Sequence, residues 1–263
     1  MYFESGYSTV NGLKMYYQIH GSGDIPLVLL HGGGSTIETT FANILPFLAN
    51  NRKVIGVDLQ AHGRTGDREA GVSFAQDADD VAALMENLGI SQADFMGFSN
   101  GGSSVLQIAI RHPALVRKIV AVAACTKRSG LMEGFFDFMK TASLENMPAP
   151  LQQAYLEVAE SREGLQVMHD KDRDRMLAFT DWPEESLRSI QAPALIIAGN
   201  RDVITIEHTT EISNLIPAAE LLILPGVHGE CIGEICAFQP GSKLPEFTAY
   251  IIEEFLERQD SLA

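Results

Sequence analysis

A single serine stands among glycines in the stretch GFSNGG, residues 97–102. The apolar run ADFMGF leads into Ser99, and the run SSVLQIAI, which suits a helix, follows the glycines. A strand, a tight turn and a helix in this order hold a serine hydroxyl above the end of a parallel sheet. Glycines beside the turn remove side chains that would clash with its strained backbone. The alternative is a glycine-rich turn without chemistry, and against it the pattern predicts that Ser99 is a nucleophile.

A serine hydroxyl needs a base to remove its proton, and the base needs an acid to orient it. Two later β-like runs end in suitable side chains: APALIIAGN is followed by Asp202, and AELLILPGV is followed by His228. The carboxyl ends of parallel strands meet at one edge of a sheet. We therefore expect Ser99, His228 and Asp202 to form a catalytic triad at that edge.

Backbone N–H groups are needed to bind the negative oxygen that forms when a serine attacks a carbonyl. The run HGGGST, residues 31–36, follows the β-like run PLVLL and lets the backbone approach a substrate closely. We expect the N–H group of Gly33, or alternatively that of Gly34, to form an oxyanion hole with the N–H group of Asn100.

Other histidines are weaker candidates for the base. We expect His31 to hold the glycine loop by hydrogen bonds, and His62, in DLQAHGRTGD, to belong to the scaffold at the edge of the site. His208 is expected on an exposed helix, and His169 lies in the charged run HDKDRDR, which suits a solvated face. None of these positions suits the base of a triad as well as His228.

The elements that must position these residues alternate along the chain. An Asn-Gly pair between two β-like runs predicts a hairpin over residues 6–20. Nearly continuous apolar strands separated by helices then indicate a parallel sheet covered on both faces. The expected later strands are 26–30, 53–58, 93–98, 117–125, 192–200 and 219–227. The expected helices between the first four of these are 37–49, 74–89 and a helix that runs from about residue 100 to Pro113.

The alternation stops between residues 126 and 190, which read as helical without a strand. We interpret this segment as an inserted helical cap, and residues 1–125 and 191–263 as the core. The cap holds five of the nine methionines. Soft apolar side chains of this kind can line an adaptable pocket, although they can also simply pack the cap onto the sheet. The predicted pocket residues are Phe135, Phe136, Met139 and Trp182.

Composition excludes several classes of partner and site. A formal charge of −15 argues against binding to nucleic acid or an anionic membrane. Three cysteines make a disulfide framework improbable, and Cys231 and Cys236 lack the further ligands that a metal site needs. The first ten residues do not resemble a signal peptide, and no apolar run approaches the length of a membrane span. We expect a cytoplasmic protein without a metal or cofactor.

Five motifs in this order, HGGG, DLQAHGRT, GFSNGG, GNRD and GVHG, resemble those of the α/β-hydrolase superfamily. More narrowly they resemble its cap-bearing serine hydrolases, such as carboxylesterases and 3-oxoadipate enol-lactonases. The resemblance implies an eight-stranded sheet with an antiparallel second strand, and a site beneath a lid that enters after strand six. Two features depart from it: Asn200 stands where the family often has Asp, and the segment 229–243 is longer than expected.

The expected function is a cofactor-independent serine hydrolase that cleaves a small-molecule carboxylic ester, lactone or thioester. Hydrolysis of a C–C bond and perhydrolysis of the haloperoxidase type use the same triad and stay open as alternatives. A ligand-binding or sensory protein on this fold is an alternative of another class. The oligomeric state is left open by the sequence.

Overall fold

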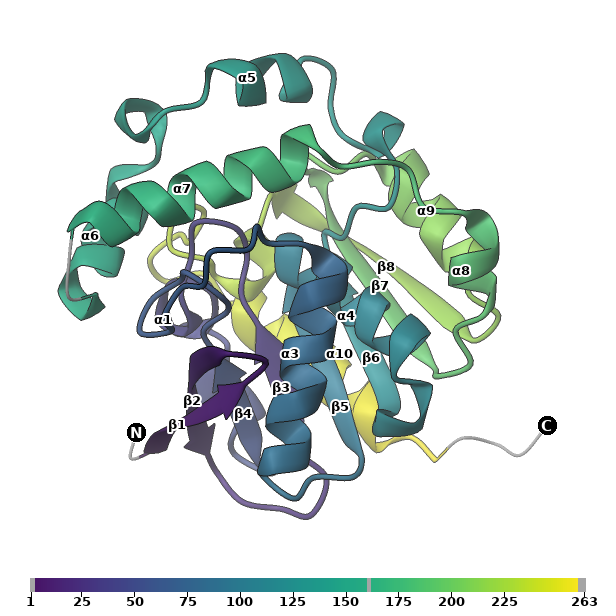
Figure 1. The fold of residues 1–263 in the computed structure, drawn as a ribbon. Coiled ribbons are helices and arrows are strands. Elements are labelled where there is room, and N and C mark those ends of the chain that lie inside the picture. Colours follow the sequence, from purple (N-terminus) through teal and green to yellow (C-terminus); the bar gives the residue numbers. More distant parts are fainter. Residues whose placement is uncertain (1–2, 160–161, 260–263) are drawn as a thin grey trace.

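An eight-stranded sheet forms the centre of the molecule, and the computed structural model describes residues 3–159 and 162–259. The strand order is β1-β2-β4-β3-β5-β6-β7-β8 (Figure 1). Strand β2 is antiparallel to both neighbours, and all pairs from β4 to β8 are parallel, which confirms the expected α/β sheet. The strands are β1 (Glu4–Val10), β2 (Leu13–His20), β3 (Leu27–Leu30), β4 (Val54–Val57), β5 (Ala93–Phe98), β6 (Val116–Val122), β7 (Ala194–Arg201) and β8 (Ala219–Val227).

The predicted hairpin at the start of the chain is present as β1 and β2. Asn11 and Gly12 join the two strands, and both have positive φ angles, 47° and 78°. Two consecutive positive φ angles are the signature of the turn whose twist matches a two-residue hairpin. The Asn-Gly pair is therefore a local signal that the structure confirms.

Helices cover both faces of the sheet (Figure 1). Side chains from α3, α4, α8 and α9 belong to one buried cluster, and side chains from α1, α2 and α10 belong to the other. The helices are α1 (Ile37–Phe41), α2 (Leu45–Leu48), α3 (Phe74–Asn87), α4 (Asn100–Arg111), α8 (Glu184–Arg188), α9 (Ile206–Leu215) and α10 (Leu244–Glu257).

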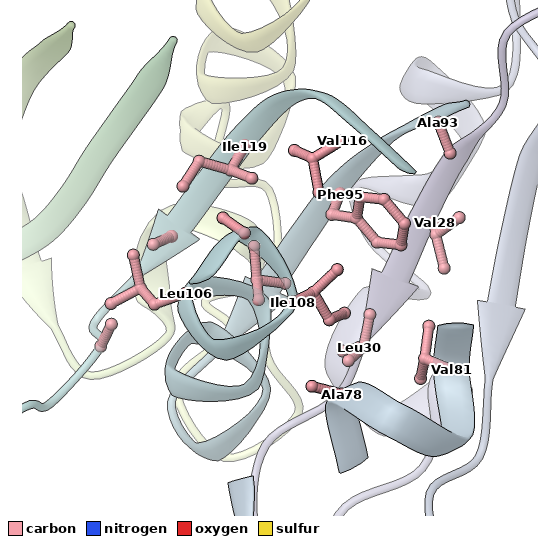
Figure 2. Close-up of a cluster of buried hydrophobic side chains, with 14 of the residues drawn as sticks. Val28, Leu30, Ala78, Val81, Ala93, Phe95, Leu106, Ile108, Val116 and Ile119 are labelled. Carbon is pink, nitrogen blue, oxygen red and sulfur yellow. The ribbon is translucent and has the colours of Figure 1, made fainter. Parts of the chain in front are cut away.

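Alternate side chains of the central strands belong to one or the other of these two clusters. Val28 and Leu30 of β3 and Phe95 of β5 face the cluster that α3 and α4 cover, as Figure 2 shows. Leu27 and Leu29 face the opposite cluster. Because successive side chains of a strand point to opposite faces, a strand covered on both faces must be apolar throughout. This explains the unbroken apolar runs of the sequence.

The segment between β6 and β7 crosses over the sheet as helices (Figure 1). Two backbone hydrogen bonds fix its ends: Met132 N–H donates to Val203 O of the core, and Trp182 N–H donates to Thr126 O, which joins the end of the segment to its start. Among the described residues, no helix combines the length and the apolar character that a membrane span needs. The segment contains α5 (Phe135–Thr141), α6 (Ala149–Val158), α7 (Arg162–Leu177) and α8.

Candidate active site

The turn between β5 and α4 holds Ser99 in a strained conformation. Its φ and ψ angles are 54° and −118°, and α4 begins at the next residue, Asn100. A Cβ atom on Gly97 would lie 2.0 Å from the carbonyl oxygen of Gly101, and one on Gly101 would lie 2.1 Å from that of Leu30. No side chain fits at either position. The two glycines are therefore required by the close approach of β5, α4 and β3 around Ser99.

Hydrogen bonds connect Ser99, His228 and Asp202 in a row. His228 Nε2 lies 3.1 Å from Ser99 Oγ, and His228 Nδ1 lies 2.7 Å from Asp202 Oδ1. The carboxylate accepts a hydrogen bond from the Nδ1–H group, so Nε2 carries no proton and can accept a hydrogen bond from the serine hydroxyl. Asp202 follows β7 and His228 follows β8, so the structure brings together the three residues that the sequence singled out.

The Asp202 carboxyl is buried, with 1% of its side chain exposed. Burial alone would raise its pKa. The hydrogen bond and charge interaction with His228, together with the N–H group of Ile204 at 3.0 Å, instead hold the pKa of Asp202 below its ordinary value of 3.8. The carboxyl therefore stays ionised and keeps the imidazole in one orientation.

The glycine loop after β3 lies beside Ser99, as the oxyanion-hole hypothesis requires. The N–H groups of Gly33 and Asn100 have no hydrogen-bond partner within residues 3–159 and 162–259. Gly34 differs, because its N–H group donates to Asp172 Oδ2 at 2.7 Å. A Cβ on Gly33 would lie 2.6 Å from the side-chain nitrogen Nδ2 of Asn100. Gly33 remains the candidate donor, and Gly34, the alternative, is already engaged.

His31 holds the glycine loop in place, as expected from the sequence. Its ring is fully buried; Nδ1 lies 2.8 Å from Gly32 O, and Nε2 accepts from the N–H group of Leu59 at 3.0 Å. Because Nε2 accepts, the proton sits on Nδ1 and the ring is neutral. Burial lowers the pKa of His31 to about 3, so the ring stays neutral through the physiological range.

Apolar side chains from core and cap line a cavity of about 440 Å³ that reaches Ser99 and His228. Phe135 and Met139 lie in its wall, but Phe136 and Trp182, the other two predicted pocket residues, do not. The lining positions of α5 recur at helical spacing, and Phe136 falls outside that face, where its ring stacks on the Arg128 guanidinium. Trp182 packs instead against the rings of Phe74 and Phe179. Further apolar residues of the wall are Phe74, Leu131, Phe138, Leu151, Met168, Met176, Val203 and Ile204.

The charged run of the cap is not a solvated face, contrary to the sequence-based expectation. His169 and Asp172 of α7 line the cavity, and Asp172 Oδ2 lies 2.8 Å from His62 Nε2. The periodicity contains the signal that was missed: Leu165, Met168 and Asp172 follow one another at spacings of three and four residues. Asp172 therefore lies on the apolar stripe of α7.

A further expectation is corrected by burial. His208 is 4% exposed, and its Nε2 accepts from the N–H group of Thr126 at the start of the cap, so it does not lie on an exposed face. The long segment 229–243 does not line the cavity. It packs beside α1, where Gly233 O accepts from Asn43 and Ile235 N–H donates to Thr39 O. This segment supports the loop that carries His228.

The sequence matches the family model described as alpha/beta hydrolase fold over residues 25–169. The dihydrolipoyllysine-residue acetyltransferase component of the acetoin cleaving system of Pseudomonas putida is 28% identical over 81% of this chain and 60% of its own length. The chain thus spans less than two thirds of this relative. The 2-hydroxymuconate semialdehyde hydrolase of Pseudomonas sp. (strain CF600) is 26% identical over 93% of this chain and 92% of its own. The bifunctional esterase/perhydrolase of Acinetobacter calcoaceticus is 29% identical over 84% of this chain and 92% of its own length.

Solved structures share the whole architecture. A serine hydrolase involved in carbazole degradation aligns with a TM-score of 0.79 at 20% identity, covering 97% of this chain and 99% of that one. The enol-lactonase of Burkholderia xenovorans LB400 aligns with a TM-score of 0.74 at 20% identity, covering 96% and 100%. At these identities the likeness shows the fold.

Proposed function

The chain belongs to the α/β-hydrolase fold family, and from this premise we propose that it is a serine hydrolase that cleaves a carboxylic ester, lactone or thioester through an acyl-enzyme on Ser99. The observation that carries the proposal is the row of hydrogen bonds from Ser99 through His228 to Asp202 at the wall of an apolar cavity. Family membership supports a hydrolase, and the substrate bond is the part that we add.

The reaction proceeds in two halves. Ser99 Oγ attacks the carbonyl carbon while His228 Nε2 takes the hydroxyl proton, and the N–H groups of Gly33 and Asn100 stabilise the negative oxygen. His228 then gives the proton to the leaving alcohol or thiol as its bond to the carbonyl breaks. In the second half, water loses a proton to His228 and attacks the acyl carbon. The bond between that carbon and Ser99 Oγ then breaks, His228 returns the proton to Oγ, and the carboxylic acid leaves.

Asp202 acts through the imidazole in both halves. Its carboxylate stabilises the positive charge that His228 acquires each time it takes a proton, and it does not itself become protonated. The cap segment 126–190 closes the cavity over these groups and keeps bulk water from the acyl chain. No step of this proposed reaction requires a metal or an organic cofactor.

The cavity favours uncharged acyl groups. Most of the residues in its wall are apolar, and a space of about 440 Å³ suits a small to medium acyl or aryl group. In a series of p-nitrophenyl esters of increasing acyl length, we expect kcat/KM to rise with apolar length before it falls when the cavity is full. A preference for a dicarboxylate substrate over these esters contradicts this assignment.

Hydrolysis of a C–C bond and perhydrolysis are the second candidates. The relative named as a bifunctional esterase/perhydrolase, which matches 84% of this chain, favours the latter. Both start from the same activated serine. An ester or thioester has a heteroatom leaving group that His228 can protonate directly, whereas a carbon leaving group needs a further step of protonation at carbon. For this reason the cleavage of an ester or thioester needs no catalytic group beyond the triad and the oxyanion donors.

A fluorophosphonate probe tests the proposal, because it reacts with activated serines. We expect the wild-type protein to be labelled at Ser99, and Ser99→Ala to lose labelling and about 10⁵-fold or more of the esterase kcat. Ser213→Ala, which changes a serine of α9 away from the cavity, is the matched control and keeps both. A wild-type protein that is not labelled, and that turns over no ester, lactone or thioester, leaves the ligand-binding alternative standing.

A further inference from the structure

Asp172 joins the cap to two loops of the core. The residue lies on α7, and its Oδ2 atom accepts from the N–H group of Gly34 at 2.7 Å and contacts His62 Nε2 at 2.8 Å. Gly34 belongs to the glycine loop after β3, and His62 to the loop after β4. Gly34 and Asp172 are separated by 138 positions in the sequence. One carboxylate oxygen thus connects three segments at the wall of the cavity.

His62 carries a positive charge in this arrangement. Its Nδ1 atom lies 2.8 Å from Gln60 O and its Nε2 atom faces the carboxylate, so both nitrogens need a proton. Burial lowers the pKa of His62, but the charge of Asp172, its hydrogen bond to the ring and the hydrogen bond to Gln60 O together outweigh burial and leave that pKa above 6.5. The other ionisable side chains that act on the pair are His31, which is neutral, Arg175, whose Nε lies 3.9 Å from Asp172 Oδ1, and the buried Asp77, which is paired with Arg175.

The glycine loop is held from two sides. From the core, the side-chain amide of Asn100 lies against Gly33. From the cap, Asp172 accepts a hydrogen bond from the N–H group of Gly34, which has a positive φ angle of 67°. Fixing this N–H group fixes the peptide between Gly33 and Gly34. It therefore restricts the orientation of Gly33, whose own N–H group is the proposed oxyanion donor.

We propose that Asp172 is a positioning residue that sets the oxyanion-binding geometry of the glycine loop when the cap is closed, and that His62 neutralises its charge. The inference rests on the proposed function. A lone carboxylate beside the oxyanion hole would repel the negative oxygen of the transition state, and this repulsion is strong where water is excluded. The imidazolium of His62 removes that penalty, so the pair can orient the loop without opposing the reaction.

Steady-state hydrolysis of p-nitrophenyl butyrate tests this role. Asp172→Ala should lower kcat by about 10- to 100-fold with a change in KM of less than about threefold. The reason is that a misplaced donor reduces the stabilisation of the transition state more than it reduces the binding of the substrate. Asp172→Asn should keep most of the wild-type kcat. Its amide oxygen still accepts from Gly34.

The control is Asp174→Ala, two residues further along α7, where the carboxylate is exposed and pairs with Arg173. This variant should keep the wild-type kcat and KM. The inference is overturned if Asp172→Ala keeps the wild-type kcat, or if Asp172→Asn loses as much as Asp172→Ala. A wild-type protein without esterase activity or labelling of Ser99 overturns the proposed function instead, so the two failures are distinguishable.

His62→Gln supplies a second test that does not depend on the folding of Asp172→Ala. Glutamine can donate a hydrogen bond to Asp172 but carries no charge, so kcat should fall about tenfold. Adding Asp172→Asn to this variant removes the carboxylate charge that His62 no longer compensates, and it should restore part of the lost kcat. Losses that multiply in the double variant overturn the neutralising role of His62.

Discussion

At the residue scale, three histidines near the candidate site differ in their protons because they differ in their partners. His31 accepts from a backbone N–H group and is neutral. His62 faces a carbonyl oxygen and a carboxylate and is charged. His228 faces a carboxylate on one side and a serine hydroxyl on the other, and so it can cycle between the two states. The neighbouring groups alone account for the three different roles.

The ion pair between His62 and Asp172 predicts a pH window for stability. The pKa of Asp172 is held below its ordinary 3.8, so its contribution is present above that value and is lost as pH falls through the lowered pKa. The pKa of His62 is raised above 6.5, so its contribution is present below 6.5 and is lost as pH rises through the raised pKa.

Urea unfolding of the wild-type protein and of Asp172→Ala across a pH series measures this window. The difference in free energy of unfolding should be largest between about pH 4 and pH 6.5 and should shrink on both sides. Asp174→Ala should show no such maximum, because that carboxylate is exposed. A difference that grows steadily toward alkaline pH contradicts the assigned charges.

The sequence predicts some of these residues well and others not at all. Ser99, Asp202 and His228 each directly follow a strand of a parallel sheet. A local sequence pattern therefore predicts the position of each residue, and the sheet brings the three together because its parallel strands end at the same edge. Asp172 acts on Gly34 across 138 positions, and nothing in the local run HDKDRDR specifies that contact. Only the docking of α7 on the core creates it.

At the element scale, α7 joins the cap to the core through buried charges as well as apolar side chains. Arg175 Nη1 lies 2.9 Å from Asp77 Oδ2 of α3, and both side chains are nearly inaccessible to water. Ser104 of α4 donates to the same carboxylate oxygen at 2.8 Å. The pair therefore connects the cap to two helices of the core.

Removal of one partner of this pair should be costly. Arg175→Met leaves the Asp77 carboxylate buried without its charge partner, and breaking a buried pair in this way destabilises a protein by about 3–5 kcal/mol. Urea unfolding followed by circular dichroism measures the loss. Arg188→Met, which removes an exposed arginine paired with Glu184, should change stability by less than about 1 kcal/mol.

Replacement of both partners separates the charge effect from packing. Arg175→Met with Asp77→Leu leaves no unpaired charge and should regain part of the loss, although Ser104 then lacks its acceptor. If the double variant is as unstable as Arg175→Met alone, the cost comes from packing and the interpretation of the pair is wrong.

Elements with a simple period were predictable, and an element with a mixed face was not. The strands of the sheet are apolar throughout and the hairpin carries its Asn-Gly signal, so both were identified correctly. Helix α7 buries Asp172 and Arg175 together with Leu165 and Met168, and a rule that counts only apolar residues misses half of this face. The compensating charges that allow such burial lie on other elements.

At the scale of the whole molecule, the core and the cap are built on different principles. The central strands are fully buried between helices, and their side chains alternate between two apolar clusters. Helix α5 contains no buried residue and lies at the outside of the cap (Figure 1). Local stability follows the number of buried apolar contacts, so the two parts should open with very different free energies.

Hydrogen–deuterium exchange read by mass spectrometry tests this order. Amides of β3, β5 and β6 should exchange slowest, because their opening requires the sheet to unfold, and amides of α5 should exchange first. A fluorophosphonate with an apolar chain, attached to Ser99, would place that chain against Phe135 and Met139 of the cavity wall. Exchange in α5 and α7 should then slow, whereas exchange in α10, no residue of which lines the cavity, should not change. Equal protection of α5 with and without the bound chain contradicts a cap that closes over the substrate.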